Sequence, residues 1–135
     1  MSHRLVEMRR MTGTITVNTG LHIGGSQETM EISGLDNPII RNPANGEPFI
    51  PGSSLKGRMR SLAEWYFQEL PTNGDGASPN PEARTARVFG IPAQSDLQRG
   101  PTRLIVRDAL LSSESREKFM AGQPITEVKS ENSID

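Results

Sequence analysis

The strongest constraint on the fold of this chain is a helical pattern over residues 53–70. Apolar side chains recur there at three- and four-residue steps, which places them in one stripe along a helix. The stripe consists of Leu55, Met59, Leu62, Ala63, Tyr66 and Leu70. Ser53 or Ser54 can serve as the N-cap, and Pro71 is expected to end the helix. The pattern therefore predicts a long amphipathic helix that packs its stripe on a sheet.

The start of this helix has a composition suited to an anion. Residues 51–60 read Pro-Gly-Ser-Ser-Leu-Lys-Gly-Arg-Met-Arg, with three cations and no acid. Unpaired N–H groups at a helix start favour an anion, whereas cations there oppose the helix dipole. At about 100° per residue, Lys56 and Arg60 share one edge of the stripe, and Arg58 lies nearly opposite. The residues alone leave two interpretations open: a phosphate site, or a solvated first turn.

The composition excludes several other kinds of protein. The net charge of −1 excludes a general polyanion-binding surface, so a nucleic-acid site must be local. There is no cysteine, which excludes disulfides and thiolate metal sites. No apolar run approaches the roughly 20 residues needed to cross a bilayer, so we expect no membrane association. The length of 135 residues predicts a single domain over 1–135, with a thin core because only 33% of residues are hydrophobic.

The remaining elements are weaker. Residues 12–23 alternate apolar and polar side chains, which predicts a strand, and residues 102–111 predict a second one. A long loop follows the first strand, and the Asn45-Gly46 pair within residues 39–50 predicts a hairpin there. Short helices or turns are expected over 82–89 and 112–120, and an extended segment over 125–135. The order is that of half a split β-α-β unit of the ferredoxin-like type, without its second half.

Several motifs in this order make the chain similar to the RAMP superfamily. Residues 19–25 read Thr-Gly-Leu-His-Ile-Gly-Gly, residues 36–40 read Asp-Asn-Pro-Ile-Ile, and residues 51–60 carry the Gly-Ser-Ser-Leu-Lys-Gly block. Within the superfamily, the chain resembles the repeated backbone subunit, of the Csm/Cmr kind, of type III CRISPR–Cas effector complexes. The resemblance implies an α+β fold with an RRM-like (ferredoxin-like) core and a long hairpin insertion between the first strand and the first helix.

The resemblance also implies a function and partners. Copies of such a subunit, with other RAMP subunits, form a filament on guide (CRISPR) RNA. They cleave paired target RNA at regular intervals, as a metal-dependent endoribonuclease of antiviral defence in the prokaryotic cytoplasm. Family members continue beyond the segment that ends this chain, through an RNA-contacting thumb and the second half of the fold. We therefore expect an N-terminal portion of the RAMP domain, either a fragment or a short subunit completed by partners.

The site residues follow from the same resemblance. Asp36 matches the catalytic aspartate and is also a tentative ligand for Mg²⁺ or a similar divalent cation. The residues expected to bind RNA are Gly52, Ser53, Ser54, Lys56, Arg58, Arg60, Lys129 and Asn132. Taken alone, Asp36 stands before Asn-Pro and is a good turn former. A loop carboxylate can also bind Mg²⁺ or act as a base toward a ribose 2′-hydroxyl.

Two other functions remain open from the residues. The first is a non-catalytic structural subunit of the same assembly, in which Asp36 only forms a turn. The second is an unrelated enzyme that holds a nucleotide or sugar phosphate at the helix start, although few convergent catalytic groups support it. Charge is also uneven: residues 84–107 carry five cations and one acid, and residues 112–135 carry three cations and five acids. Such opposite surfaces suit head-to-tail stacking of copies, or reflect only random surface charge.

Overall fold

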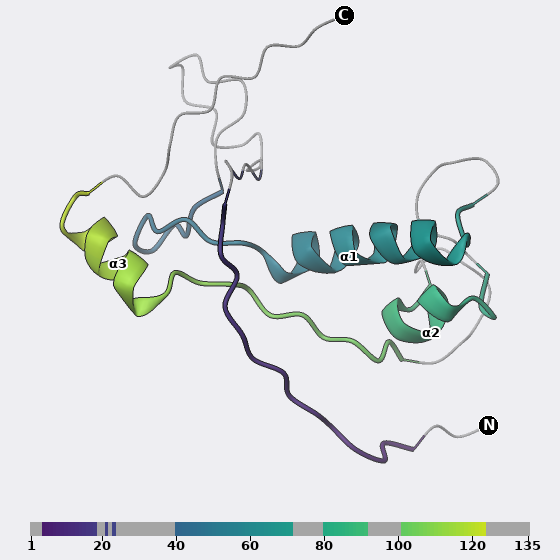
Figure 1. Cartoon of the computed structure of the whole chain (residues 1–135). Helices are drawn as coiled ribbons and strands as arrows, with labels where there is room; N and C mark the ends of the chain where they lie inside the picture. Colours follow the sequence, from purple (N-terminus) through teal and green to yellow (C-terminus); the bar gives the residue numbers. More distant parts are fainter. Residues whose placement is uncertain are drawn as a thin grey trace, which may run out of the picture. The chain divides into compact units, whose positions relative to one another are not determined.

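The computed structural model describes residues 4–18, 21, 23, 40–71, 80–91 and 101–123. Three helices lie in this part of the chain: α1 (Gly52–Phe67), α2 (Arg84–Phe89) and α3 (Ser113–Met120) (Figure 1). The described backbone elsewhere pairs as strands only at two isolated antiparallel bridges, Arg41 with Pro48 and Ile50 with Ala109. The chain divides into two compact units, one of Met1–Arg10 with Pro51–Asp108 and one of Met11–Ile50 with Ala109–Asp135. The expected single domain over 1–135 stays a prediction.

α1 confirms the long predicted helix but has different ends. Its N-cap is Pro51, so the prediction that Ser53 or Ser54 caps the helix was wrong. The other end comes before Pro71, because Gln68 adopts the left-handed conformation with φ of 57°. In this conformation the Gln68 N–H donates to the carbonyl oxygen of Trp65 at 3.2 Å. The backbone itself therefore ends the helix, and proline is not needed.

The apolar stripe of α1 is not covered by the described residues. Met59 is 45% exposed, Leu62 53% and Tyr66 83%. The buried residues of the helix are instead Gly52 and Glu64. The expected packing of the stripe on a sheet is thus not seen in the described part of the chain.

Neither predicted strand forms a ladder there. Residues 12–18 are outside any strand, and Ile15 and Val17 are about half exposed. Residues 101–111 also lie outside any strand, with bends at 101 and 103, and among them only Ala109 forms a bridge. Alternation of apolar and polar residues indicates on which side each side chain would lie in a strand. Strand formation also requires a neighbouring strand that hydrogen-bonds to the backbone N–H and C=O groups. The remaining residues of the first predicted strand, except 21 and 23, and the segment 125–135 lie outside the described residues.

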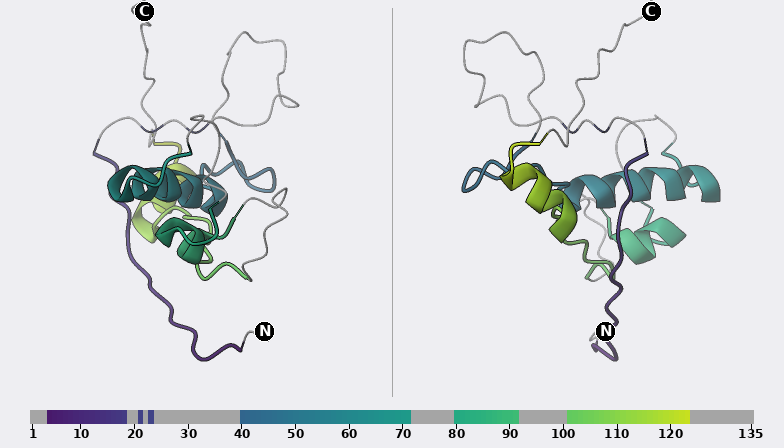
Figure 2. Two further views of the ribbon diagram at one scale, coloured as in Figure 1. Left: turned by 90° about the vertical axis from the view of Figure 1, so that its right-hand side faces the viewer. Right: turned by 60° about the vertical axis from the view of Figure 1, so that its left-hand side comes forward.

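The unit that contains α1 and α2 also holds the segment 101–108. α2 lies beside α1 in each of the views (Figures 1 and 2). The segment is attached to both helices by hydrogen bonds. The N–H groups of Arg103 and Leu104 donate to the carbonyl oxygen of Val88, at 3.2 and 3.1 Å. At the other end of the segment, the Gly52 N–H donates to Asp108 Oδ1 at 2.8 Å.

The second unit contains the predicted turn and α3. Gly46 has a φ of 74°, and its N–H donates to the carbonyl oxygen of Asn42 at 2.7 Å. The turn expected at Asn45-Gly46 is thus present, but its role as an insertion in a sheet stays a prediction. α3 confirms the helix expected over 112–120, with Ser112 as its N-cap. Arg116 Nε joins α3 to the turn through Glu47 Oε1 at 3.1 Å.

Candidate nucleic-acid interface at the start of α1

The structure describes six of the nine residues to which sequence reasoning assigned a site. All six lie on α1: Gly52, Ser53, Ser54, Lys56, Arg58 and Arg60. Asp36, Lys129 and Asn132 lie outside the described residues, so their assigned roles stay predictions.

Gly52 has an intramolecular reason to be glycine. A Cβ added there would contact the carbonyl oxygen of Val106 and would lie 2.8 and 2.9 Å from the carbonyl carbons of Val106 and Arg107. Contacts below 3.0 Å to backbone require the backbone to move. The missing side chain thus lets the first residue of α1 pack directly on the segment 101–108.

Asp108 acts as a cap for α1, a role that sequence reasoning missed. Its carboxylate accepts from the Gly52 N–H, and the Leu55 N–H already donates to the Pro51 carbonyl oxygen at 3.1 Å. The N–H groups of Ser53 and Ser54 have no acceptor among the described residues, and both serines are exposed. Two N–H groups and two hydroxyls at this helix start are therefore open to an anion.

Two of the three cations in this stretch are available to a ligand. The guanidinium of the exposed Arg58 has no hydrogen-bond or ion-pair partner in the described part of the chain. Lys56 Nζ donates to Thr102 Oγ1 at 3.2 Å. A neutral hydroxyl leaves the ammonium charge uncompensated, so a phosphate would be the stronger partner. The RNA-binding role assigned to Lys56 and Arg58 stays a prediction, and their charges are available for it.

Arg60 is already engaged within the unit. Its Nε lies 2.9 Å from Glu64 Oε1, and its side chain is only 13% exposed. A second nitrogen of the guanidinium donates to the carbonyl oxygen of Gly90 at 2.6 Å. Because Glu64 already balances the charge of Arg60, this guanidinium is less available to a phosphate than Lys56 or Arg58, and its RNA-binding role stays a prediction.

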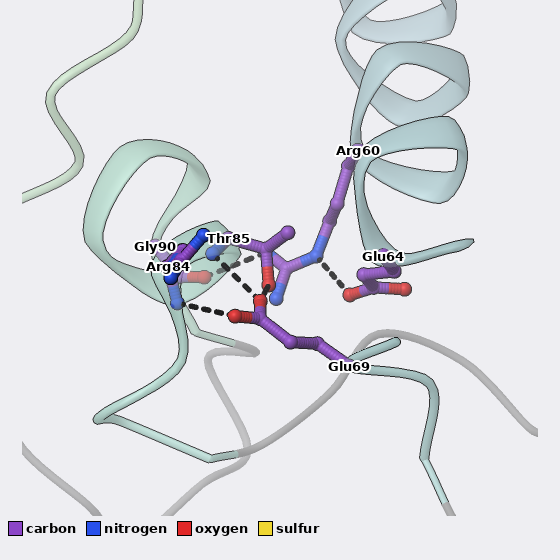
Figure 3. A network of polar contacts seen from close by, with 6 residues as sticks. All are labelled: Arg60, Glu64, Glu69, Arg84, Thr85 and Gly90. Atoms are coloured by element: carbon purple, nitrogen blue, oxygen red, sulfur yellow. Dashed lines mark hydrogen bonds and ion pairs between the residues drawn. The ribbon is translucent and has the colours of Figure 1, made fainter. Parts of the chain in front are cut away.

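Glu69, which follows α1, holds the start of α2 (Figure 3). Its carboxylate accepts from the N–H of Arg84 at 2.9 Å, the N–H of Thr85 at 3.0 Å and the Thr85 hydroxyl at 2.8 Å. Burial raises the pKa of Glu69, but these hydrogen bonds and the charge of Arg84 outweigh it and lower the pKa. With Arg60 at the Gly90 carbonyl, an acid holds the first turn of α2 and a cation holds its end, as the helix dipole favours.

The described residues do not supply a metal centre or a membrane span. In the described ranges, no three side chains of His, Asp or Glu gather where they could hold a metal ion. The fit of Asp36 to a divalent cation therefore rests on residues outside this part of the chain. Of the three helices that the structure describes, none has the length and apolar character needed to cross a membrane.

Comparison with known sequences identifies the family. Residues 14–135 match the RAMP superfamily. The chain belongs to this superfamily. Membership implies an RRM-like fold, and confirms the resemblance found in the motifs. The finer features of the predicted fold, such as the sheet and the hairpin insertion, stay predictions.

Curated relatives in this superfamily share the name "CRISPR system Cms endoribonuclease Csm3". The protein from Methanothermobacter thermautotrophicus is 41% identical, over 93% of this chain and 56% of its own length. That from Methanocaldococcus jannaschii is 42% identical, over 93% of this chain and 50% of its own length. That from Enterococcus italicus is 40% identical, over 93% and 57%. The chain thus spans about half the length of the curated relatives that it matches.

Proposed function

We propose that this chain is a subunit of a type III CRISPR ribonucleoprotein that binds guide RNA and cleaves paired target RNA. The observation that carries the proposal is the identity of 40–42% to proteins named Csm3 endoribonucleases, extending over 93% of the chain. Its partners would be guide RNA, target RNA, copies of itself and other RAMP subunits, in the cytoplasm of a prokaryotic cell.

The start of α1 supports the part of the proposal that concerns guide RNA. Ser53 and Ser54 offer N–H and hydroxyl groups, and Lys56 and Arg58 add positive charge. Such groups bind a phosphate without reading the base, so they position a strand. Sequence choice would then come from base pairing between guide and target. This division of labour is consistent with a net charge of −1, since it needs a local phosphate site and no broad basic surface.

For cleavage, we propose that Asp36 is the base. The 2′-hydroxyl of the target ribose would lose its proton to the Asp36 carboxylate, and its oxygen would attack the adjacent phosphorus. The new bond joins the 2′-oxygen to phosphorus, and the bond to the 5′-oxygen of the next nucleotide breaks. The products are a 2′,3′-cyclic phosphate and a 5′-hydroxyl that takes a proton from water. This chemistry requires a 2′-hydroxyl, so RNA would be cut and DNA would not.

Mg²⁺ or a similar divalent cation is proposed as a cofactor, and Asp36 would be one of its ligands in the alternative in which this carboxylate is not the base. When bound, such an ion would neutralise charge on the phosphate that is attacked. Cleavage assays of the purified ribonucleoprotein in Mg²⁺ and in EDTA would test this part separately. Full activity in EDTA would refute the metal requirement and leave the role of Asp36 untouched.

The test of the catalytic assignment is Asp36→Ala in the purified ribonucleoprotein. Loss of a general base lowers the rate by about 10²–10⁴-fold, while guide and target binding should be unchanged. Glu31→Gln removes an acid from the same stretch of sequence and serves as the control, with cleavage expected to continue. Equal cleavage by Asp36→Ala and the unaltered particle would instead favour a non-catalytic structural subunit.

A further inference from the structure

The segment 101–108 has two different sides. Leu104 and Val106 are partly buried, whereas Arg103, Ile105 and Arg107 are exposed. This alternation arises because successive side chains of an extended backbone point to opposite sides. Arg103, which stands at a bend, and Arg107 therefore lie on the exposed side of the segment. These three exposed residues are called the outer row below.

The outer row is held firmly in its unit. The N–H groups of Arg103 and Leu104 donate to Val88, at the end of α2. Gly52 packs on the backbone of Val106 and Arg107, and Asp108 caps α1. Lys56 also reaches the segment through the Thr102 hydroxyl. The row is thus fixed beside the start of α1 and close to Lys56.

The positive charges of the outer row are not balanced by acids among the residues that the structure describes. The side chains of Arg103 and Arg107 have no hydrogen-bond or ion-pair partner in the described ranges. Three of the described acids of Pro51–Asp108 are used elsewhere: Glu64 pairs with Arg60, Glu69 holds α2, and Asp108 caps α1. Among the described acids of Pro51–Asp108, Glu82 is the exception, since its carboxylate has no described partner. The row therefore presents net positive charge to solvent.

We propose that the outer row binds the sugar–phosphate backbone of single-stranded RNA, extending the contact made at the start of α1. This inference rests on the proposed function and adds Arg103 and Arg107 to its RNA-binding residues. Two exposed guanidinium groups on one side suit phosphates along one strand, because each guanidinium can bind a phosphate in a bidentate manner. Between them, Ile105 is 62% exposed and offers an apolar surface to a ribose or a base. An acidic polypeptide could pair with the two arginines, but it would gain less than RNA from contact with the apolar Ile105.

The experiment compares Arg103→Gln/Arg107→Gln with the unaltered 135-residue chain. Binding of a fluorescent single-stranded RNA is measured over a range of salt concentrations. Each phosphate contact to a single strand contributes about 0.7 to the slope of log K against log salt, so the double variant should lose about 1.4. Arg103→Lys/Arg107→Lys keeps both charges and should keep most of the slope. Circular dichroism of each variant checks that the helices remain.

A matched control removes two charges elsewhere. Arg4 and Arg10 are exposed and precede the residues that match the family, so Arg4→Gln/Arg10→Gln should change the slope much less. An equal loss in control and test variants would overturn the inference, because charge alone would then explain it. Unchanged RNA binding by the test variant would also overturn the inference. This holds too if the variant loses self-association, measured by sedimentation, while its RNA binding is unchanged. If the unaltered chain binds no RNA, the proposed function itself is refuted.

Discussion

Two glycines of α1 allow a stringent test of whether the start of this helix packs on the segment 101–108. Gly52→Ala places a methyl group against the backbone of Val106 and Arg107, with carbonyl carbons at 2.8 and 2.9 Å. Overpacking of this kind costs about 1–3 kcal/mol. Gly57 lies five residues further along the same helix, is exposed, and has nothing within 4 Å of an added Cβ. Gly57→Ala should therefore stabilise the helix by up to about 1 kcal/mol, because alanine favours a helix interior over glycine.

The two variants should thus differ by about 1–4 kcal/mol in the free energy of unfolding, with opposite signs relative to the parent. Urea unfolding of the 135-residue chain, followed by the helical signal in far-ultraviolet circular dichroism, measures this difference. The same chemical change at two sites on one helix removes intrinsic helix propensity as an explanation. Equal stabilisation by both alanines would show that Gly52 does not pack on the segment 101–108, and would refute the reasoning.

Two further predictions concern the polar contacts of the same unit. Glu69→Gln should lower the free energy of unfolding by about 1–2 kcal/mol at pH 7, because it removes a charged cap from α2. The pKa of Glu69 is lowered in the folded chain, so its contribution is full above the ordinary value of 4.5 and is lost as the pH falls through the folded value. A difference between variant and parent that persists below this range would contradict the assignment. Asp108→Ala should cost about 1 kcal/mol by uncapping Gly52, measured by urea unfolding, whereas Asp108→Asn keeps an acceptor and should cost less.

Local signals in the sequence were sufficient for the helices and for one turn. The apolar spacing predicted α1, and Asn45-Gly46 predicted the turn in which Gly46 has positive φ. These features depend on residues within a few positions of one another. The end of α1 at Phe67 was missed because Gln68, which is not a residue type that marks helix ends strongly, takes the left-handed conformation.

Contacts between distant residues could not be predicted in the same way. Gly52 and Asp108 are 56 positions apart, and Glu69 meets Thr85 across 16 positions. Nothing in the local sequence of either acid distinguishes a helix cap from a solvated carboxylate. Gly52 was assigned to RNA through the family motif, yet its contact with Val106 explains its identity without RNA. A motif can thus combine residues that bind a ligand with residues that pack the helix against the rest of its unit.

The difference between ligand-binding and structural residues also decides which cations can be substituted to test RNA binding. In the described part of the chain the buried hydrophobic residues are Ala83 and Ala86, both at or near α2, so polar contacts contribute much of the attachment between α1 and α2. Arg60 is one of these contacts, through Glu64 and the Gly90 carbonyl. Reversing its charge would loosen α2 whether or not RNA is bound. Lys56 and Arg58 lack an acidic partner among the described residues, so loss of RNA binding on their substitution can be attributed to the ligand.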